Sequence, residues 1–91
     1  MKFCLIAPGH TSIPPIGWGA VESIIWDYHG ILTKLGHRVD IVNTVQKNDI
    51  VRHINTNTYD VIHVMYDDHV DIIDHIKNNA IILYTTHWAY L

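Results

Sequence analysis

The sequence has little cysteine, few basic residues and no long apolar run. One cysteine, Cys4, among 91 residues leaves no internal disulfide, so the chain is not a disulfide-stapled secreted scaffold. Six Lys and Arg residues are scattered against nine Asp and Glu, and the formal net charge of −3 argues against the clustered basic face that binds nucleic acid. No apolar stretch approaches the ~18–20 residues of a membrane span. We therefore expect a cytoplasmic domain without a nucleic-acid partner and without a membrane span.

What the sequence does contain is enough apolar material for one small folded domain. Hydrophobic residues make up 48% and charged residues 16% of the chain, which is too apolar and too weakly charged for a disordered segment. Ninety-one residues correspond to a single domain, residues 1–91, in which only roughly 60–65% of the unfolded surface is buried on folding. Such a domain has little stability to spare.

Short β-branched runs alternate with helical patterns along the chain, and this alternation predicts a parallel α/β sheet. Apolar runs predict strands at 3–7, 38–43, 61–65 and 80–85, and apolar residues at helical spacing predict helices at 20–35, 46–56 and 67–78. The expected fold is a three-layer Rossmann-like half-sheet of four parallel strands in the order 3-2-1-4 with three helices. In that order the ligand crevice lies between strands 1 and 4.

A loop at residues 8–19 holds all three prolines and three of the five glycines, and it is longer than the ~2–6 residues usual before a helix. Gly17, Trp18, Gly19 and Ala20 stand where this loop leads into the first predicted helix. Glycines expose backbone N–H groups and a helix N-terminus adds a partial positive charge, so this segment suits a phosphate or diphosphate. The full dinucleotide fingerprint is not met, and a purely conformational Pro/Gly turn is an equal alternative.

Eight histidines raise the question of a metal site. Asp71 and His75 share a face of the third predicted helix, with Asp67 one turn earlier, and a carboxylate with an imidazole at that spacing can ligate zinc. No thiolate or second helical histidine completes the set, so a solvated polar face is favoured and no metal is expected. His63 lies within an apolar strand, where a hydrogen-bonded core residue is favoured over a ligand.

Four motifs occur in order along nearly the whole chain, at residues 14–22, 35–39, 59–63 and 85–87. They read Pro-Pro-Ile-Gly-Trp-Gly-Ala-Val-Glu, Leu-Gly-His-Arg-Val, Tyr-Asp-Val-Ile-His and Thr-Thr-His. As an ordered set they resemble the N-terminal part of the family 4 retaining glycosyltransferases, which have the GT-B fold. The resemblance implies a domain of an enzyme that transfers a sugar from a nucleotide-sugar donor to an acceptor.

The resemblance also implies a division of labour between two Rossmann-like domains. The N-terminal domain mainly holds the acceptor, the C-terminal domain holds most of the nucleotide-sugar donor, and no metal or other cofactor is needed. By its place in the last motif, His87 is the expected catalytic residue, facing the reacting sugar or the acceptor. The other site residues are expected at the donor diphosphate (Gly17, Trp18, Gly19, Ala20) and at the acceptor (His10, Tyr66, Asp67, Asp68).

The chain corresponds, by this resemblance, to about the first half of the family's N-terminal domain. We therefore expect it to be inactive alone, and either to associate with itself or to be part of something longer with a C-terminal domain. Its fourth predicted strand supports this expectation, because Ile81, Ile82 and Leu83 form an apolar run at a sheet edge. The alternative function is a non-catalytic α/β binding or assembly module.

Overall fold

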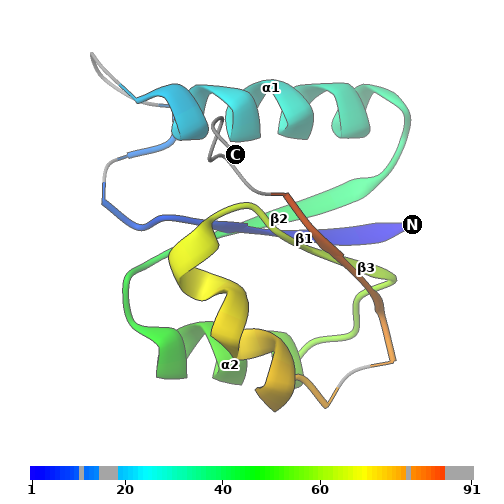
Figure 1. Cartoon of the computed structure of the whole chain (residues 1–91). Coiled ribbons are helices and arrows are strands. Elements are labelled where there is room, and N and C mark those ends of the chain that lie inside the picture. Colours follow the sequence, from blue (N-terminus) through cyan, green and yellow to red (C-terminus); the bar gives the residue numbers. More distant parts are fainter. Residues whose placement is uncertain (11, 15–18, 78, 86–91) are drawn as a thin grey trace.

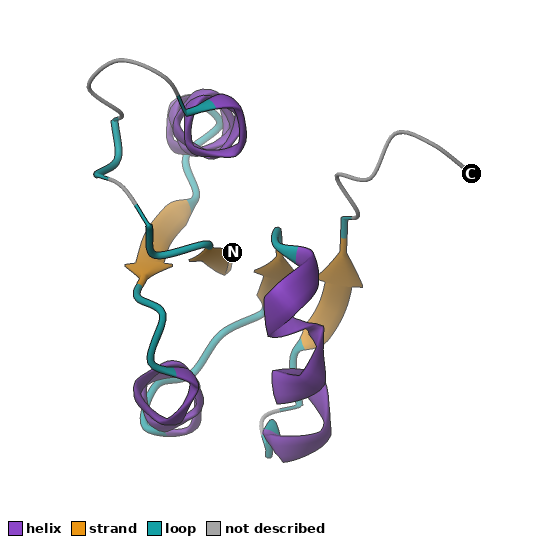
Figure 2. Cartoon of the chain, turned by 60° about the vertical axis from the view of Figure 1, so that its left-hand side comes forward, coloured by secondary structure: helices purple, strands orange, loops and turns teal. Residues whose placement is uncertain are grey.

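The computed structural model of the protein describes residues 1–10, 12–14, 19–77 and 79–85. Its elements are β1 (Lys2–Ala7), α1 (Ala20–Lys34), β2 (Arg38–Asn43), α2 (Lys47–Asn55), β3 (Val61–Val64), η1 (Asp67–His75) and β4 (Ile81–Tyr84). A parallel four-stranded sheet forms the middle layer, with α1 on one face and α2 and η1 on the other (Figure 1). Figure 2 shows α1 and α2 nearly end-on, on opposite sides of the strands. The expected three-layer α/β class is confirmed.

The strands lie in the order β2-β1-β3-β4, which corrects the expected order 3-2-1-4. β3 pairs in parallel with β1, and β4 pairs with β3. The physical reason lies in β2, which carries Arg38, Asp40 and Asn43 and contains no fully buried residue, so it belongs at an edge. All four residues of β3 are buried, as an inner strand requires. The strand order therefore reverses between β1 and β3, and not between β1 and β4.

β1 separates two apolar cores, because its side chains alternate between the faces of the sheet. Phe3, Leu5 and Ala7 face α1, whereas Cys4 and Ile6 face α2. All five are buried, as an uninterrupted apolar run predicts for a strand covered on both sides. The core on the α1 side is completed by Ile25, Leu32, Val61 and Met65, and the core on the α2 side by Ile50, Ile54, Tyr59, Ile62, Val64 and Ile72.

α1 begins and ends close to the predicted residues. Gly36 has φ +90°, and the N–H groups of Gly36 and His37 donate to the carbonyl oxygens of Thr33 and Leu32 at 3.0 and 3.1 Å. These two hydrogen bonds form a Schellman C-cap. In the described part of the chain, no helix is both long and apolar enough to cross a membrane. The predicted apolar face of α1 is only partly buried: Ile25 and Leu32 lie in the core, Val21 and Tyr28 are half-buried, and Ile24 and Leu35 are exposed.

The third helix, expected as an α-helix over 67–78, is a 3₁₀ helix ending at His75, so this expectation is wrong in type. Val70, Ile73 and Ile76 recur every three positions, which matches the three residues per turn of a 3₁₀ helix. Near its two ends, backbone hydrogen bonds run from the N–H of one residue to the carbonyl oxygen three residues earlier, as from Ile76 to Ile73. The three-residue spacing was the available signal for this helix type.

β4 lies at the edge of the sheet, as expected for the fourth strand. Ile81, Leu83 and Tyr84 keep 59%, 42% and 44% of their surface exposed. Within the described ranges no further strand pairs with the outer side of β4, so an apolar parallel strand faces solvent.

Candidate functional site

The loops that follow β1 and β3 meet at the carboxyl end of the sheet. His10 Nε2 and the Tyr66 hydroxyl are 3.2 Å apart, and their rings pack edge to face with centroids 5.6 Å apart. Because strand order reverses between β1 and β3, this is the place where a parallel α/β sheet presents its ligand crevice. The structure thus brings together two of the residues expected at the acceptor.

A cavity of about 280 Å³ opens beside this pair. Val45, from the loop after β2, and Lys47, the first residue of α2, form two of its walls. Asp68 also lines the cavity, whereas the Asp67 carboxylate accepts a hydrogen bond from the Tyr84 hydroxyl of β4. The full lining is Pro8, His10, Val45, Lys47, Tyr66, Asp68 and His69.

Gly9 fixes the path of the loop after β1. Its φ is +88°, and a Cβ added there meets the carbonyl carbon of Thr44 at 2.2 Å. Glycine is required, because a side chain would meet both an unfavourable left-handed backbone and space that the chain after β2 occupies. The Gly9 N–H donates to Asn43 Oδ1 at 2.9 Å, which ties the two loops together. The Pro-Gly pair in the sequence predicts a turn but not this contact.

His69 is a residue of the cavity that the sequence reasoning missed. It is 3% exposed, and its Nε2 donates to the Pro8 carbonyl oxygen at 3.1 Å, so Nε2 carries a proton. Its Nδ1 is buried and has no hydrogen-bond partner among the described residues. The ring also packs edge to face on Tyr66, with centroids 5.4 Å apart. His69 therefore holds the start of η1 against the end of β1, a long-range contact that no local pattern signals.

Lys47, the first residue of α2, connects this helix to η1 through hydrogen bonds. Its Nζ donates to the main-chain oxygen of Asp68 at 2.5 Å and to the two carboxylate oxygens of Asp71 at 2.8 and 2.9 Å. The hydrogen bond from Lys47 lowers the pKa of the Asp71 carboxyl below its ordinary value. Asp71 is thus engaged in an ion pair and not in the zinc site weighed with His75. No three metal-ligating side chains gather anywhere in the described ranges.

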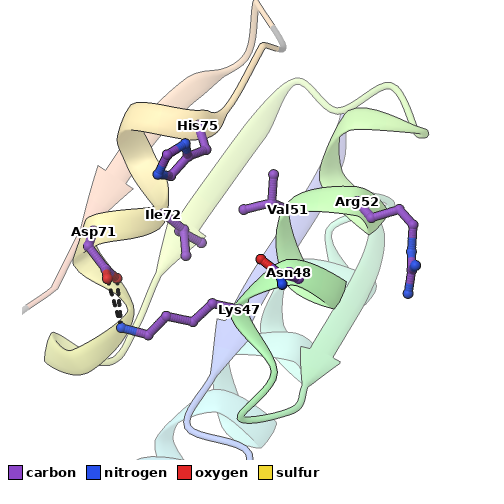
Figure 3. A pocket seen from close by; sticks show the side chains of 7 residues that line it. All are labelled: Lys47, Asn48, Val51, Arg52, Asp71, Ile72 and His75. Atoms are coloured by element: carbon purple, nitrogen blue, oxygen red, sulfur yellow. Dashed lines mark hydrogen bonds and ion pairs between the residues drawn. The ribbon is translucent and has the colours of Figure 1, made fainter.

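A second cavity, of about 430 Å³, lies between α2 and η1 (Figure 3). Val51 and Ile72 face each other across it, the Lys47–Asp71 ion pair closes one end, and Arg52 points away. None of the residues expected at the donor or the acceptor lines this cavity, so the first cavity is the better candidate. The lining is Lys47, Asn48, Val51, Arg52, Asp71, Ile72 and His75.

The carboxyl end of the sheet is acidic around Tyr66. The pKa of the Tyr66 phenol lies above its usual range, first because burial disfavours the phenolate, and then because the carboxylates of Asp68, Glu22 and Asp67 repel it. The hydroxyl therefore stays protonated at neutral pH and both donates and accepts hydrogen bonds.

The donor side of the expected site is described only in part. Gly17, Trp18 and His87 lie outside the described residues. Gly19 is the N-cap of α1, and its carbonyl oxygen accepts the Ser23 N–H at 2.9 Å. No side chain caps the helix there. The chain runs from β1 through this loop into α1, so the N-terminus of α1 lies at the same end of the sheet as the first cavity (Figure 1).

Comparison with known proteins finds similarity at the level of the fold. No family model matches the sequence, and no curated protein matches it. Among solved structures, the crystal structure of AviGT4, a glycosyltransferase involved in avilamycin A biosynthesis, matches with a TM-score of 0.79 and 20% sequence identity. The match covers 96% of this chain and 32% of that chain. The chain therefore spans about a third of the length of that glycosyltransferase and shares the fold of that part.

Proposed function

We propose that the chain is the acceptor side of a glycosyltransferase, which transfers a sugar from a nucleotide-sugar donor together with a donor-binding domain. The observation that carries the proposal is the contact between His10 and Tyr66 across the point of strand reversal, beside a cavity of about 280 Å³. The fold shared with a glycosyltransferase supports it. On its four ordered motifs, we assign the chain to the retaining enzymes of family 4. Its single cysteine leads us to propose a cytoplasmic location.

The acceptor lies, in this proposal, in the cavity at the carboxyl end of the sheet. His10 and Tyr66 offer hydrogen-bond donors and acceptors to hydroxyl groups, and Asp68 offers a carboxylate. Pro8 and Val45 supply an apolar wall for the CH groups of a sugar ring. A sugar presents this combination of polar edges and apolar faces, so a hydroxylated ring fits the lining.

The donor diphosphate lies, in this proposal, at the N-terminus of α1. The backbone N–H groups of Gly17, Trp18, Gly19 and Ala20 would face it, and the helix dipole favours an anion there. The absence of a capping side chain on α1 leaves its first amides available among the described residues. His87 is assigned to the reacting sugar or acceptor as the catalytic residue. The nucleotide sugar is the donor substrate, with no metal or other cofactor.

We expect the 91-residue chain to be inactive by itself, because the family resemblance assigns most of the donor-binding surface to a second domain. The chain covers 32% of the glycosyltransferase whose fold it shares. The measurement is incubation of the purified chain with nucleotide sugars and a panel of acceptors. Turnover above that of a buffer blank would contradict this expectation.

Chemical-shift mapping with uridine diphosphate tests the donor side. The backbone amides of residues 17–22 are expected to shift, and those lining the cavity between α2 and η1 are expected to stay unchanged. The variant Ala20→Pro removes one N–H at the first position of the helix, where proline is tolerated, and is expected to weaken binding several-fold. Ala20→Ser is the matched control and keeps the N–H. Shifts elsewhere, or equal binding by both variants, reject the diphosphate site.

A non-catalytic binding or assembly module is the second candidate, and the exposed edge of β4 favours it. An apolar parallel edge is a template for association with another copy of the chain. Sedimentation at rising concentration is expected to show dimers or larger species. Leu83→Lys, on β4, is expected to restore the monomer, whereas Ile31→Lys, which also replaces an exposed apolar residue but on α1, is not. A stable wild-type monomer at high concentration would rule out self-association.

A further inference from the structure

His69 is buried at the carboxyl end of the sheet with only one of its two ring nitrogens in use. The residue is 3% exposed, and its Nε2 donates to the Pro8 carbonyl oxygen at 3.1 Å. Its Nδ1 is also buried and has no hydrogen-bond partner among the described residues. A buried nitrogen without a partner lowers the stability of a fold, and most buried polar groups in native proteins are paired. A residue that breaks this rule points to a role in function.

The hydrogen bond from His69 to Pro8 fixes the loop that carries His10. Gly9, between Pro8 and His10, is itself held, because its φ is +88° and its N–H donates to Asn43 Oδ1 at 2.9 Å. The chain before His10 is therefore tied at two consecutive residues, Pro8 and Gly9. The His10 side chain is exposed, so its place above the sheet depends on these two ties.

The ring of His69 also supports the ring of Tyr66. The first turn of η1 is closed by a hydrogen bond from the His69 N–H to the Tyr66 carbonyl oxygen, 3.1 Å long. Because a 3₁₀ helix has three residues per turn, side chains three residues apart lie on the same side of it. The two rings pack edge to face with centroids 5.4 Å apart. One side chain therefore holds the loop of His10 and the ring of Tyr66 together.

We propose that His69 is a positioning residue of the acceptor site, which holds His10 and Tyr66 at a fixed spacing for the hydroxyl groups of a sugar, at a cost to the stability of the fold. His10 Nε2 and the Tyr66 hydroxyl are 3.2 Å apart, and all three residues line the cavity of about 280 Å³. Groups that are already held in place lose little freedom on binding, so their affinity for a ligand is higher. This inference rests on the proposed function and adds a residue to the same site.

Three variants of the full chain test the inference, and the first measurement needs no ligand. His69→Phe keeps a ring beside Tyr66 but removes the donor to Pro8. His69→Gln keeps an N–H donor, and His75→Phe, at an exposed position of η1, is the matched control. NMR cross-peaks between the ring protons of His10 and Tyr66 are expected to disappear in His69→Phe and to remain in the other two variants. Cross-peaks that persist in His69→Phe overturn the inference.

Titration with glucose distinguishes positioning of the site from support of the fold. His69→Phe is expected to bind glucose about tenfold more weakly, which is the loss that one ordinary hydrogen bond would cause. His69→Gln and His75→Phe are expected to bind it as the wild type does. The urea midpoint of His69→Phe is expected to be unchanged, because the variant also removes the buried nitrogen that has no partner. A lowered urea midpoint with unchanged glucose affinity assigns His69 to the fold alone and overturns the inference. His69→Leu, which is smaller, carries the same expectations if the phenyl ring does not fit.

The outcomes separate this inference from the proposed function. If glucose binds the wild type and every variant equally, the acceptor site stands and the role of His69 is rejected. If glucose does not bind while uridine diphosphate still shifts the amides of residues 17–22, the acceptor site and the inference both fail and the donor side stands. If neither glucose nor the nucleotide binds, the proposed function fails as well.

Discussion

Tyr59 joins the sheet to α2 through one hydroxyl group. It is 3% exposed, donates a hydrogen bond to Asp40 Oδ2 at 2.8 Å and lies 2.7 Å from His53 Nε2. Burial, followed by the hydrogen bond to Asp40, holds the pKa of this phenol far above its usual range. The next residue, Asp60, accepts the Lys2 N–H at 2.7 Å. The first two residues of the Tyr-Asp-Val-Ile-His motif thus hold the fold together.

Tyr59→Phe is expected to destabilise the fold by about 1–3 kcal/mol, because it leaves two half-buried polar groups, Asp40 and His53, without their shared partner. The matched control is Tyr84→Phe, which also removes a tyrosine hydroxyl bonded to an aspartate, but from a strand residue that is 44% exposed. The control is expected to cost within about 0.5 kcal/mol. Urea unfolding measures both. Equal losses of unfolding free energy in the two variants would mean that the buried Tyr59 hydroxyl stabilises the fold no more than the exposed Tyr84 hydroxyl does.

Two glycines are expected to respond in opposite directions to the same substitution. Gly9→Ala is expected to cost more than about 2 kcal/mol, because of its positive φ and the backbone of Thr44 at 2.2 Å from the new Cβ. Gly30→Ala is expected to stabilise the fold by about 0.5–1 kcal/mol, because the new Cβ in α1 meets nothing within 4 Å. Thermal unfolding of the two variants checks the signs. A stabilised Gly9→Ala would contradict the described path of the loop.

At the scale of the elements, the sequence was most informative where pattern and packing agree. β1 is an uninterrupted apolar run and is covered on both faces, and α1 is bounded by Gly19 and Gly36, so both were predicted. The strand order was not predicted, because it depends on which strand lies at an edge of the sheet. The polar residues Arg38 and Asp40 are compatible with an edge position of β2, but they do not by themselves say which strand pairs with β1 on its other side. η1 was mistaken for an α-helix, because the three-residue spacing of Val70, Ile73 and Ile76 was taken as one side of an α-helix and not as the repeat of a 3₁₀ helix.

The Lys47–Asp71 ion pair makes a predictable contribution to the pH dependence of the fold. The folded pKa of Asp71 is lowered, so the pair stabilises the fold above the ordinary carboxyl pKa of about 3.9, and this stabilisation is lost as pH falls through the lowered value. Carboxyl-carbon NMR titration is expected to show the Asp71 midpoint rising toward its ordinary value in Lys47→Met. Lys77→Met, at the other end of η1, is expected to leave it in place. An unchanged Asp71 midpoint in Lys47→Met would contradict the ion pair with Lys47 as the cause of the lowered pKa.

The whole molecule is compact and yet open along one edge. Its Cα radius of gyration is 12.6 Å, close to the roughly 12 Å expected for a folded domain of this length. Two apolar cores enclose β1 and β3, while Ile81, Leu83 and Tyr84 of β4 stay exposed. His10 and Tyr66 were expected at the acceptor from a resemblance and from their place after strands. The position of β3 beside β1, which brings them together, was not predicted, because pairing between strands far apart in sequence leaves no local signal.

The central claim is that ligands bind where β1 and β3 end, at the same end of the sheet as the N-terminus of α1. A chemical-shift map of the chain with glucose and uridine diphosphate present together tests this most directly. The account predicts that the changes gather on residues 8–10, 19–22 and 66–69. Changes that gather between α2 and η1, or along the exposed edge of β4, would contradict it.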